Sequence, residues 1–344
     1  MLFVIGNGFD IALGLKTSYK DFLVWYLKQK TDDKEILKLK NSIRKDLEKN
    51  NLKSWADLEM KLGSYTSQYG ESIDECMRFT SAYYNIKENL NKHLKLQENK
   101  INNNINLPTI IKDVRTFFVN FYDDFPAEII SDLEPRFKNA KSKIKYDFAT
   151  FNYTKTLRSC LDLKNKIINQ RPHSYGSYDD YINKIEFIHG EIDNIPVMGV
   201  DNETQIANEF FRKQENIKLL LLKPHLNQEM QDGIIGRICN LINDSSVICI
   251  FGSSIGNSDI FWWKKLGEWL INHSSKRLVI FWYEDEKTRK LHGDKRILIE
   301  NKVRRNFIEL ANIDILKYSE LKGQIHVHVH DKIFKTKFTS RKKK

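Results

Sequence analysis

Cysteine is scarce in this chain, which has only four cysteines among its 344 residues. The four are scattered and form no C-x-x-C pair, so neither a structural zinc site nor a disulfide framework is indicated. We therefore expect buried or incidental thiols and predict no metal. The cysteines are Cys76, Cys160, Cys239 and Cys249.

Long apolar runs are also missing. No stretch approaches the roughly 20 consecutive apolar residues that a bilayer crossing needs. No basic leader precedes the apolar segment Leu2–Ile5, which has the character of a core strand rather than of a secretory signal. We therefore expect a cytoplasmic protein with no membrane partner. Internal repeats and the paired-carboxylate metal motif of familiar nucleases are absent as well.

Positive charge, by contrast, is abundant. The chain has 56 Lys and Arg residues against 45 Asp and Glu residues, a net charge of +11. Such a balance favours a polyanionic partner. Part of the excess lies in the tail Arg341–Lys344, and much of the rest lies in helical stretches where lysines alternate with acids. A solvated surface explains most of it, and nucleic acid stays open as a partner.

Short apolar segments alternate with helical patterns along the chain. Continuous apolar strands of this kind indicate a parallel sheet covered on both faces. We predict an α/β fold: a Rossmann-like parallel sheet with helices on both faces and a large helical insertion after the first strand. The predicted strands are Leu2–Ile5, Lys145–Phe151, Lys184–Ile188, Pro196–Val200, Ser246–Phe251, Arg277–Tyr283 and, at an edge, Ile325–Val329.

The predicted nucleotide-binding domain comprises residues 1–16 and 141–335, the helical insertion residues 17–140, and a basic tail residues 336–344. Ser18 with Asp21 fits a capping box that opens a helix to about Lys30, and Ser258 with Asp259 can cap a helix over Ile260–Leu270. The other predicted helical stretches are Asp33–Lys49, Ser54–Leu62, Ile73–Leu96, Ile110–Tyr122 and Gln205–Asn243, with an Asn-rich loop over Glu98–Leu107.

Two glycine-rich turns follow predicted strands. The turn Gly6–Asp10 has the strand–glycine–helix context of a dinucleotide phosphate loop, although Ile11 occupies the third glycine position. Its Asp10 is expected to cap the helix or contact a ribose hydroxyl. A structural turn without a ligand explains this motif equally well when it is taken alone. The second turn, Gly252–Asp259, is longer and richer in donors than a connection requires, and two such loops in one sheet indicate a binding cleft.

Polar residues cluster where the predicted strands end. Asn152, His189, Asp201 and Ser253 all fall there, and ligands of open parallel sheets bind just beyond the carboxyl ends of the strands. A histidine titrates near neutrality and suits general-base chemistry. An uncharged asparagine can orient water or a sugar hydroxyl without repelling phosphate. Taken singly, each of these residues is more often structural.

Three further features are weaker evidence for a functional site. His326, His328 and His330 alternate and would share one face of a strand; an exposed edge face explains them better than a metal site, because no ligand set is completed. Glu59, at i+4 from Trp55, is a surface carboxylate by default, with a carboxylate reaching the cleft as the alternative. We expect core or cleft-wall positions for the tryptophans Trp262, Trp263 and Trp282.

The order of these motifs resembles that of the bacteriophage abortive-infection AbiH family, over nearly the whole chain. The matching segments are Ile5–Asp10, Gly14–Tyr19 with Phe22, Trp55 with Glu59, Thr150–Thr154, Ile188–Gly190 and Gly252–Asp259. The resemblance implies a phage-defence effector that acts in abortive infection.

The same order is more remotely similar to that of SIR2-like NAD-binding domains. This resemblance implies Asn152 and His189 as the catalytic pair. It implies NAD contacts from Gly6, Gly8, Gly252 and Ser253. The first loop departs from the usual Gly-Ala-Gly-x-Ser, Thr154 stands where an aspartate is common, and the zinc-binding cysteines of sirtuin deacylases are absent. These departures count against deacylase activity and leave NAD cleavage open.

Our first hypothesis is hydrolysis of NAD, or a related nucleotide, at the nicotinamide–ribose bond. His189 would act as the base, Asn152 would position water or ribose, and the pyrophosphate would lie on the two glycine loops. The alternatives are a nucleic-acid-targeting effector such as a nuclease and a non-enzymatic nucleotide sensor. We expect a homo-oligomer and a phage-derived trigger. The predicted NAD-binding residues are Gly6, Asn7, Gly8, Asp10, Thr150, Gly252, Ser253, Ser254 and Asp259.

Overall fold

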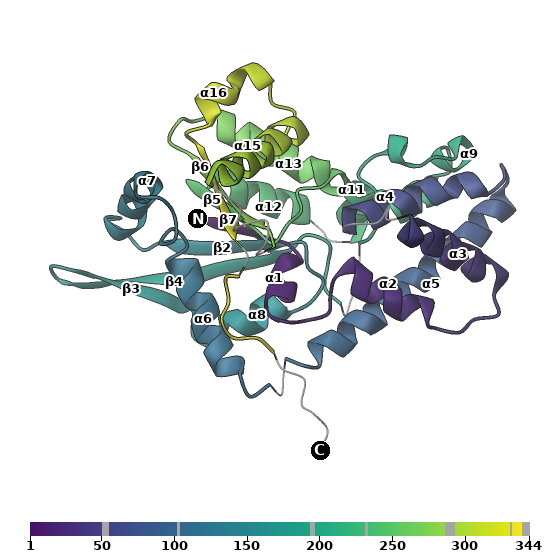
Figure 1. Cartoon of the computed structure of the whole chain (residues 1–344), viewed down its shortest axis with the longest axis horizontal. Coiled ribbons are helices and arrows are strands. Elements are labelled where there is room, and N and C mark those ends of the chain that lie inside the picture. Colours follow the sequence, from purple (N-terminus) through teal and green to yellow (C-terminus); the bar gives the residue numbers. More distant parts are fainter. Residues whose placement is uncertain are drawn as a thin grey trace.

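A computed structural model describes residues 1–49, 55–101, 104–192, 197–230, 233–285, 293–330 and 332–338. Its centre is a seven-stranded sheet in the order β3-β4-β2-β1-β5-β6-β7 (Figure 1). All neighbouring strands are parallel except the hairpin pair β3–β4. The strands are β1 (Leu2–Ile5), β2 (Lys145–Thr150), β3 (Ile167–His173), β4 (Gly176–Phe187), β5 (Val247–Phe251), β6 (Arg277–Tyr283) and β7 (Ile325–His330).

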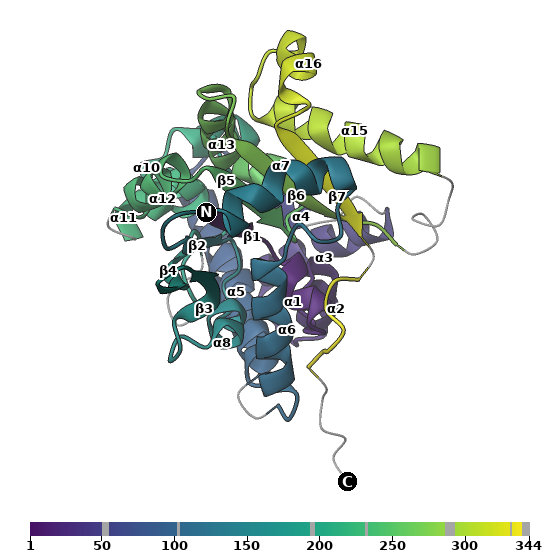
Figure 2. The ribbon, with the colours of Figure 1, turned by 90° about the vertical axis from the view of Figure 1, so that its left-hand side faces the viewer.

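Helices cover both faces of this sheet, because alternate residues of each strand enter different hydrophobic cores. On β1, Phe3 and Ile5 pack with α6 (Leu107–Val119), α7 (Ala127–Lys138) and α8 (Thr156–Leu161). Leu2 and Val4 pack on the other face with α12 (Ile234–Asn243), α13 (Ile260–Ile271) and α15 (Gly293–Leu310). Figure 2 shows the two layers on opposite sides of the strands.

The large helical insertion lies between β1 and β2, as the sequence predicts. The short α1 (Gly8–Ala12) precedes it, and the insertion runs through α2 (Tyr19–Leu27), α3 (Lys34–Glu48), α4 (Trp55–Tyr65) and α5 (Ile73–Glu98) to α6 and α7. Helices α2 to α5 form a separate lobe beside the sheet (Figure 1). Its core includes side chains from the segment that follows β4, such as Met198 and Phe211. This packing places α4 next to the ends of the central strands.

The other α-helices of the described residues are α9 (Glu209–Arg212), α10 (Glu215–Leu221), α11 (Lys223–Met230) and α16 (Tyr318–Leu321). The predicted helical pattern over Gln205–Asn243 is confirmed as a series of short helices that ends with α12. The predicted strand Pro196–Val200 is wrong over residues 197–200, where only an isolated bridge joins Val200 to Leu222; Pro196 lies outside the described residues. The sequence reading missed β3, the antiparallel edge strand.

Several expected boundaries shift slightly. The Ser18 side chain accepts a hydrogen bond from the Asp21 backbone N–H, as expected of a helix cap, but α2 ends at Leu27. Ser54 lies outside the described residues. Within the Asn-rich stretch, Glu98 closes α5 and Leu107 opens α6, while residues 102–103 lie outside the described part. All four cysteines are free, and three are buried.

After β7 the chain continues as an ordered strap, residues 332–338. Phe334 packs edge-on against Phe9 and Phe117, and the Phe338 backbone N–H donates to the Leu13 carbonyl oxygen at 2.8 Å. The predicted basic tail 336–344 therefore begins inside a packed segment. Residues 339–344, including Arg341–Lys344, lie outside the described residues.

Candidate functional site

One cavity of about 590 Å³ opens at the carboxyl ends of the parallel strands. This is the edge where ligands bind in folds of this class. All the residues that we predict to form the site line it except Thr150. They are Gly6, Asn7, Gly8, Asp10, Asn152, His189, Gly252, Ser253, Ser254 and Asp259.

His189 follows β4 and is held by a carboxylate from the loop after β5. Its side chain is only 4% exposed, and its Nε2 lies 2.9 Å from Asp259 Oδ1. A carboxylate accepts hydrogen bonds, so Nε2 carries the proton and Nδ1 carries the lone pair. Among the described residues Nδ1 has no hydrogen-bond partner. Burial lowers the pKa of His189, and the charge of Lys223 lowers it further. The imidazole is therefore a neutral base at physiological pH.

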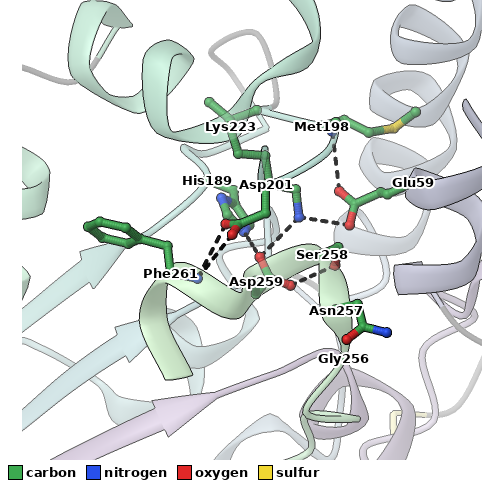
Figure 3. A network of polar contacts seen from close by, with 12 residues as sticks. Glu59, His189, Met198, Asp201, Lys223, Gly256, Asn257, Ser258, Asp259 and Phe261 are labelled. Atoms are coloured by element: carbon green, nitrogen blue, oxygen red, sulfur yellow. Dashed lines mark hydrogen bonds and ion pairs between the residues drawn. The ribbon is translucent and has the colours of Figure 1, made fainter. Parts of the chain in front are cut away.

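Lys223, the first residue of α11, joins this pair to the helical insertion (Figure 3). Its Nζ lies 3.0 Å from Asp259 Oδ1 and 2.7 Å from Glu59 Oε2, and its side chain is 3% exposed. Burial lowers the pKa of Lys223, but the charges of Asp259 and Glu59 outweigh burial and raise it. The lysine is therefore protonated, and two carboxylates share its charge.

The two carboxylates of this network behave differently. Burial raises the pKa of Asp259, but the charge of Lys223 and the hydrogen bond from His189 overcome burial and hold that pKa well below its usual range. For Glu59, burial prevails over Lys223 and raises the pKa to about 7. Asp259 is consequently ionised whenever the protein is folded near neutrality, whereas Glu59 titrates close to neutral pH.

The structure corrects two expectations here. Glu59 is not a surface carboxylate: it is buried and lines the cavity. Asp259 and Ser258 do not cap α13, because the Asp259 carboxylate accepts from His189, Lys223 and the Ser258 hydroxyl instead. The cap comes from Asp201, whose carboxylate accepts the Phe261 backbone N–H at 3.2 Å. Asp201 does not line the main cavity.

Asn152, at the end of β2, is held by the buried Asp10 of α1. Asn152 Nδ2 donates to Asp10 Oδ1 at 3.0 Å, and the Thr154 hydroxyl donates to Asp10 Oδ2 at 2.5 Å. Burial raises the pKa of Asp10 to about 7, and hydrogen bonds from Thr154 and Asn152 oppose the shift only in part. Asp10 is a residue of α1 rather than its cap. Thr150 does not line the cavity; its buried hydroxyl accepts the Asn152 backbone N–H.

The two glycine turns pack against each other. A Cβ on Gly6 would lie 2.5 Å from the Gly252 carbonyl oxygen, and one on Gly8 would lie 2.6 Å from Gly252 Cα. The Gly8 N–H donates to the Gly252 carbonyl at 2.7 Å, and the Gly6 N–H donates to the Phe251 carbonyl at 2.8 Å. Close backbone contact accounts for these glycines, and those two N–H groups are already used. The proposed pyrophosphate contact of the glycine loops thus needs other donors.

The second turn contains an unusual backbone conformation. Ile255 has a φ of 49°, a region that a β-branched residue rarely adopts. The Ser253 hydroxyl accepts the Ile255 N–H, and the Ile255 carbonyl accepts from Asn306 Nδ2. Strained residues of this kind persist where the surroundings hold them and are common at functional sites. Here the conformation carries the chain from β5 to Asp259.

Basic and aromatic side chains complete the cavity wall at its β6–β7 end. Trp282 and Tyr283 come from the end of β6, and Lys332 and Lys337 come from the strap. Trp262 and Trp263 are buried in the core as predicted, and Trp282 lies in the cavity wall. The exposed lysines of the strap are the cations best placed to meet an anionic ligand.

The alternating histidines of β7 do not form the exposed face that we expected. His326 and His330 are buried, and the rings of His328 and His330 pack against Phe281. His326 Nε2 lies 3.3 Å from Asp132 Oδ2. The strand is at the sheet edge, but α6, α7 and the strap cover this face. Among the described residues, no group of three or more His, Cys, Asp or Glu side chains is arranged to hold a metal ion.

The fold and the cavity together define a Rossmann-like α/β protein with a polar site at the strand ends. The sequence model of the family described as bacteriophage abortive infection AbiH matches residues 2–282, so the chain belongs to the AbiH family. Membership of this family implies a role in abortive infection, a defence against bacteriophages. The search among curated proteins finds no match. In the described part of the chain, every helix is too short or too polar to cross a bilayer.

Proposed function

We propose that this AbiH protein hydrolyses NAD, or a related nucleotide, at the bond between nicotinamide and ribose. The observation that carries the proposal is a neutral, buried imidazole whose Nδ1 lacks a partner among the described residues, in the same cavity as Asn152. The rings of Phe151 and Tyr153 both pack near the His189 ring, at 5.4 and 6.4 Å between centroids. Asn152 stands between these two residues in the chain, and its side chain lines the same cavity as His189.

The chemistry follows from these two groups. Nicotinamide leaves with the electron pair of its bond to the ribose carbon and becomes neutral, while the sugar becomes an oxocarbenium ion. A water molecule adds to that carbon, and His189 Nδ1 accepts the proton that the water loses. Asp259 stabilises the resulting imidazolium through the hydrogen bond at Nε2. Asn152 accepts a hydrogen bond from the water or from a ribose hydroxyl.

The cavity wall supports a dinucleotide as the ligand. Lys332 and Lys337 stand at the rim, where a pyrophosphate needs positive charge, and Trp282 offers a surface for a base. The buried Lys223 is engaged with two carboxylates and contributes little charge to the ligand. Loss of NAD in an infected cell would stop metabolism before phage release, which accords with abortive infection.

The test is release of nicotinamide from NAD by the purified chain. We expect His189→Ala and Asn152→Ala to lower kcat by roughly 10²–10⁴-fold, the usual contribution of a general base and its partners. His225→Ala is the matched control, because His225 is exposed on α11, two residues from Lys223. Undiminished hydrolysis by folded His189→Ala would reject the mechanism. Tight binding of NAD without turnover would indicate a nucleotide sensor instead.

A further inference from the structure

We propose that Asp10 is a positioning residue that fixes the amide of Asn152, so that its carbonyl oxygen Oδ1 faces the ligand. The identity of the ligand rests on the proposed function. The orientation of the amide rests on the hydrogen bonds around Asp10. The proposal adds a residue that acts through Asn152 and determines which ligand groups the site accepts.

The hydrogen bonds leave Asn152 one orientation. While Asp10 is ionised its carboxylate only accepts hydrogen bonds, so the group of Asn152 that faces it is then the NH₂. The separation of 3.0 Å between Asn152 Nδ2 and Asp10 Oδ1 is that of such a bond. The Oδ1 atom lies on the other side of the amide. It is buried and has no hydrogen-bond partner among the described residues.

Asp10 is itself held rigidly. Its side chain is fully buried, and its second oxygen accepts from the Thr154 hydroxyl. Thr154 in turn accepts from the Thr156 hydroxyl at 2.9 Å, and Thr150 accepts from the Asn152 backbone N–H at 3.0 Å. The side-chain hydrogen bonds to Asp10 and Thr154 come from the segment 150–156, and the Thr150 hydroxyl also donates to the Ile5 carbonyl oxygen at 3.3 Å. The cluster therefore serves to orient Asn152 rather than to bind a cation.

A fixed orientation selects the chemistry of the ligand. A buried acceptor without a partner is unfavourable, and a ligand group that donates a hydrogen bond removes that penalty. Asn152 Oδ1 therefore takes a donor, and it repels a phosphate or carboxylate oxygen. On NAD the donors are the ribose hydroxyls, the NH₂ of the carboxamide and the NH₂ of the adenine. If the amide were reversed, Nδ2 would face the ligand and the preference would change sign.

The test is a double-mutant cycle between Asp10→Asn and Asn152→Ala. An asparagine at position 10 can either donate or accept, so it preserves size but no longer imposes one orientation on Asn152. Asp147→Asn is the matched control. Asp147 is also buried and accepts from an amide, Asn183 Nδ2 at 2.8 Å, but it does not line the cavity. The readouts are the plating efficiency of a phage that the wild-type protein restricts, the Kd for NAD by calorimetry, and the melting temperature.

We expect Asp10→Asn to weaken protection and NAD binding by about tenfold or more, the usual scale for a hydrogen bond involving a charged group. In the Asn152→Ala background Asp10→Asn should have no further effect. Asp147→Asn should leave both protection and NAD binding unchanged. Nicotinic acid adenine dinucleotide keeps the hydroxyls and lacks the NH₂, whereas 2′-deoxy-NAD lacks a hydroxyl. The analogue that Asp10→Asn no longer discriminates from NAD identifies the donor.

Additive losses in the cycle, or full protection by Asp10→Asn, would overturn the proposal. If Asp10→Asn fails to fold, the exchange variant Asp10→Asn/Asn152→Asp decides, because it restores a carboxylate–amide pair. Recovery of folding and of protection supports positioning, and recovery of folding alone contradicts it. The proposed function is judged separately by nicotinamide release from the wild type. A chain that protects cells without cleaving NAD rejects hydrolysis, while the plating cycle still tests Asp10.

Discussion

Two buried carboxylates, Asp10 and Asp259, each hold one polar side chain of the cavity. Asp259 accepts from His189 Nε2, and Asp10 accepts from Asn152 Nδ2, at almost the same distance. They differ in whether a nearby cation offsets the cost of burying the carboxylate charge. Lys223 forms an ion pair with Asp259, whereas no ion pair to Asp10 occurs among the described residues. The pKa of Asp259 consequently falls well below its usual range, while that of Asp10 rises to about 7.

The difference shows that the same hydrogen-bond arrangement produces opposite electrostatic behaviour. The Asp259–His189 pair has a constant charge near neutrality, because a cation compensates for the cost of burying the carboxylate. The Asp10–Asn152 pair changes charge in the physiological pH range, because only neutral donors oppose burial. The charge of the Asp259–His189 pair therefore stays constant near neutrality. The charge of Asp10, which holds the Asn152 amide, changes with pH in the same range.

The largest expected effect comes from removing the cation that distinguishes the two pairs. Lys223→Met leaves Asp259 and Glu59 buried without their cation, so we expect the free energy of unfolding to fall by about 3–5 kcal/mol. Equilibrium unfolding in urea at pH 8 measures it. Lys265→Met removes a surface pair with Glu268 and should cost less than about 1 kcal/mol. Similar losses for the two variants would mean that Lys223 does not compensate Asp259.

The part of the site that sequence reasoning found lies directly at strand ends. Asn152, His189 and the glycine turns follow apolar strands, and in a parallel sheet those ends converge on one edge. The fold class followed from the same pattern, with both faces of β1 buried as its apolar run indicated. The role of Gly6 and Gly8 could not be predicted from the sequence. The same glycine pattern fits a phosphate-binding loop and a close backbone contact such as the one with Gly252.

The part that was missed depends on contacts between distant segments. Glu59 and Lys223 are 164 residues apart and meet only because the helical lobe packs on the segment after β4. Lys223 is one of 56 basic residues, and no local pattern marks it as buried. The one available signal was Glu59 on the same helix face as Trp55. The sequence predicted Asp201 at the end of a strand facing the cleft. Its contact with the N-terminus of α13 could not be predicted, because it joins segments that are distant in the sequence.

A smaller effect is expected from the proton on Asp10. Its folded pKa is raised from the ordinary 3.8 to about 7, so the folded state binds a proton more tightly, and Asp10 lowers stability as pH rises between those values. Asp10→Asn removes that penalty. We expect it to raise the free energy of unfolding by on the order of 3–4 kcal/mol at pH 8 and to change it little at pH 4.

The measurement is denaturant unfolding of wild type and Asp10→Asn from pH 4 to pH 8. Taking the difference between the two proteins cancels the contributions of other buried acids. A gain of the same size at pH 4 and pH 8 would show that packing, and not ionisation, separates the two proteins. Stabilisation together with lost protection would show that the fold tolerates an unfavourable carboxylate in order to orient Asn152.

The smallest effect on stability is expected for a substitution of Glu59, the other buried carboxylate that contacts Lys223. Glu59→Gln keeps the shape and a hydrogen-bond acceptor for Lys223 but removes one charge. Because burial outweighs the attraction of Lys223 and raises the pKa of Glu59 from 4.5 to about 7, its ionised form is unfavourable in the folded state, and we expect Glu59→Gln to raise the free energy of unfolding at pH 8 by up to about 3 kcal/mol. The gain should develop as pH rises from about 4.5 to about 7 and stay constant above that, because in this range the folded state keeps the proton that the unfolded state loses. A loss at pH 8 comparable to that of Lys223→Met would mean that Lys223 serves Glu59 rather than Asp259, and the contrast between Asp259 and Asp10 would then need another cause.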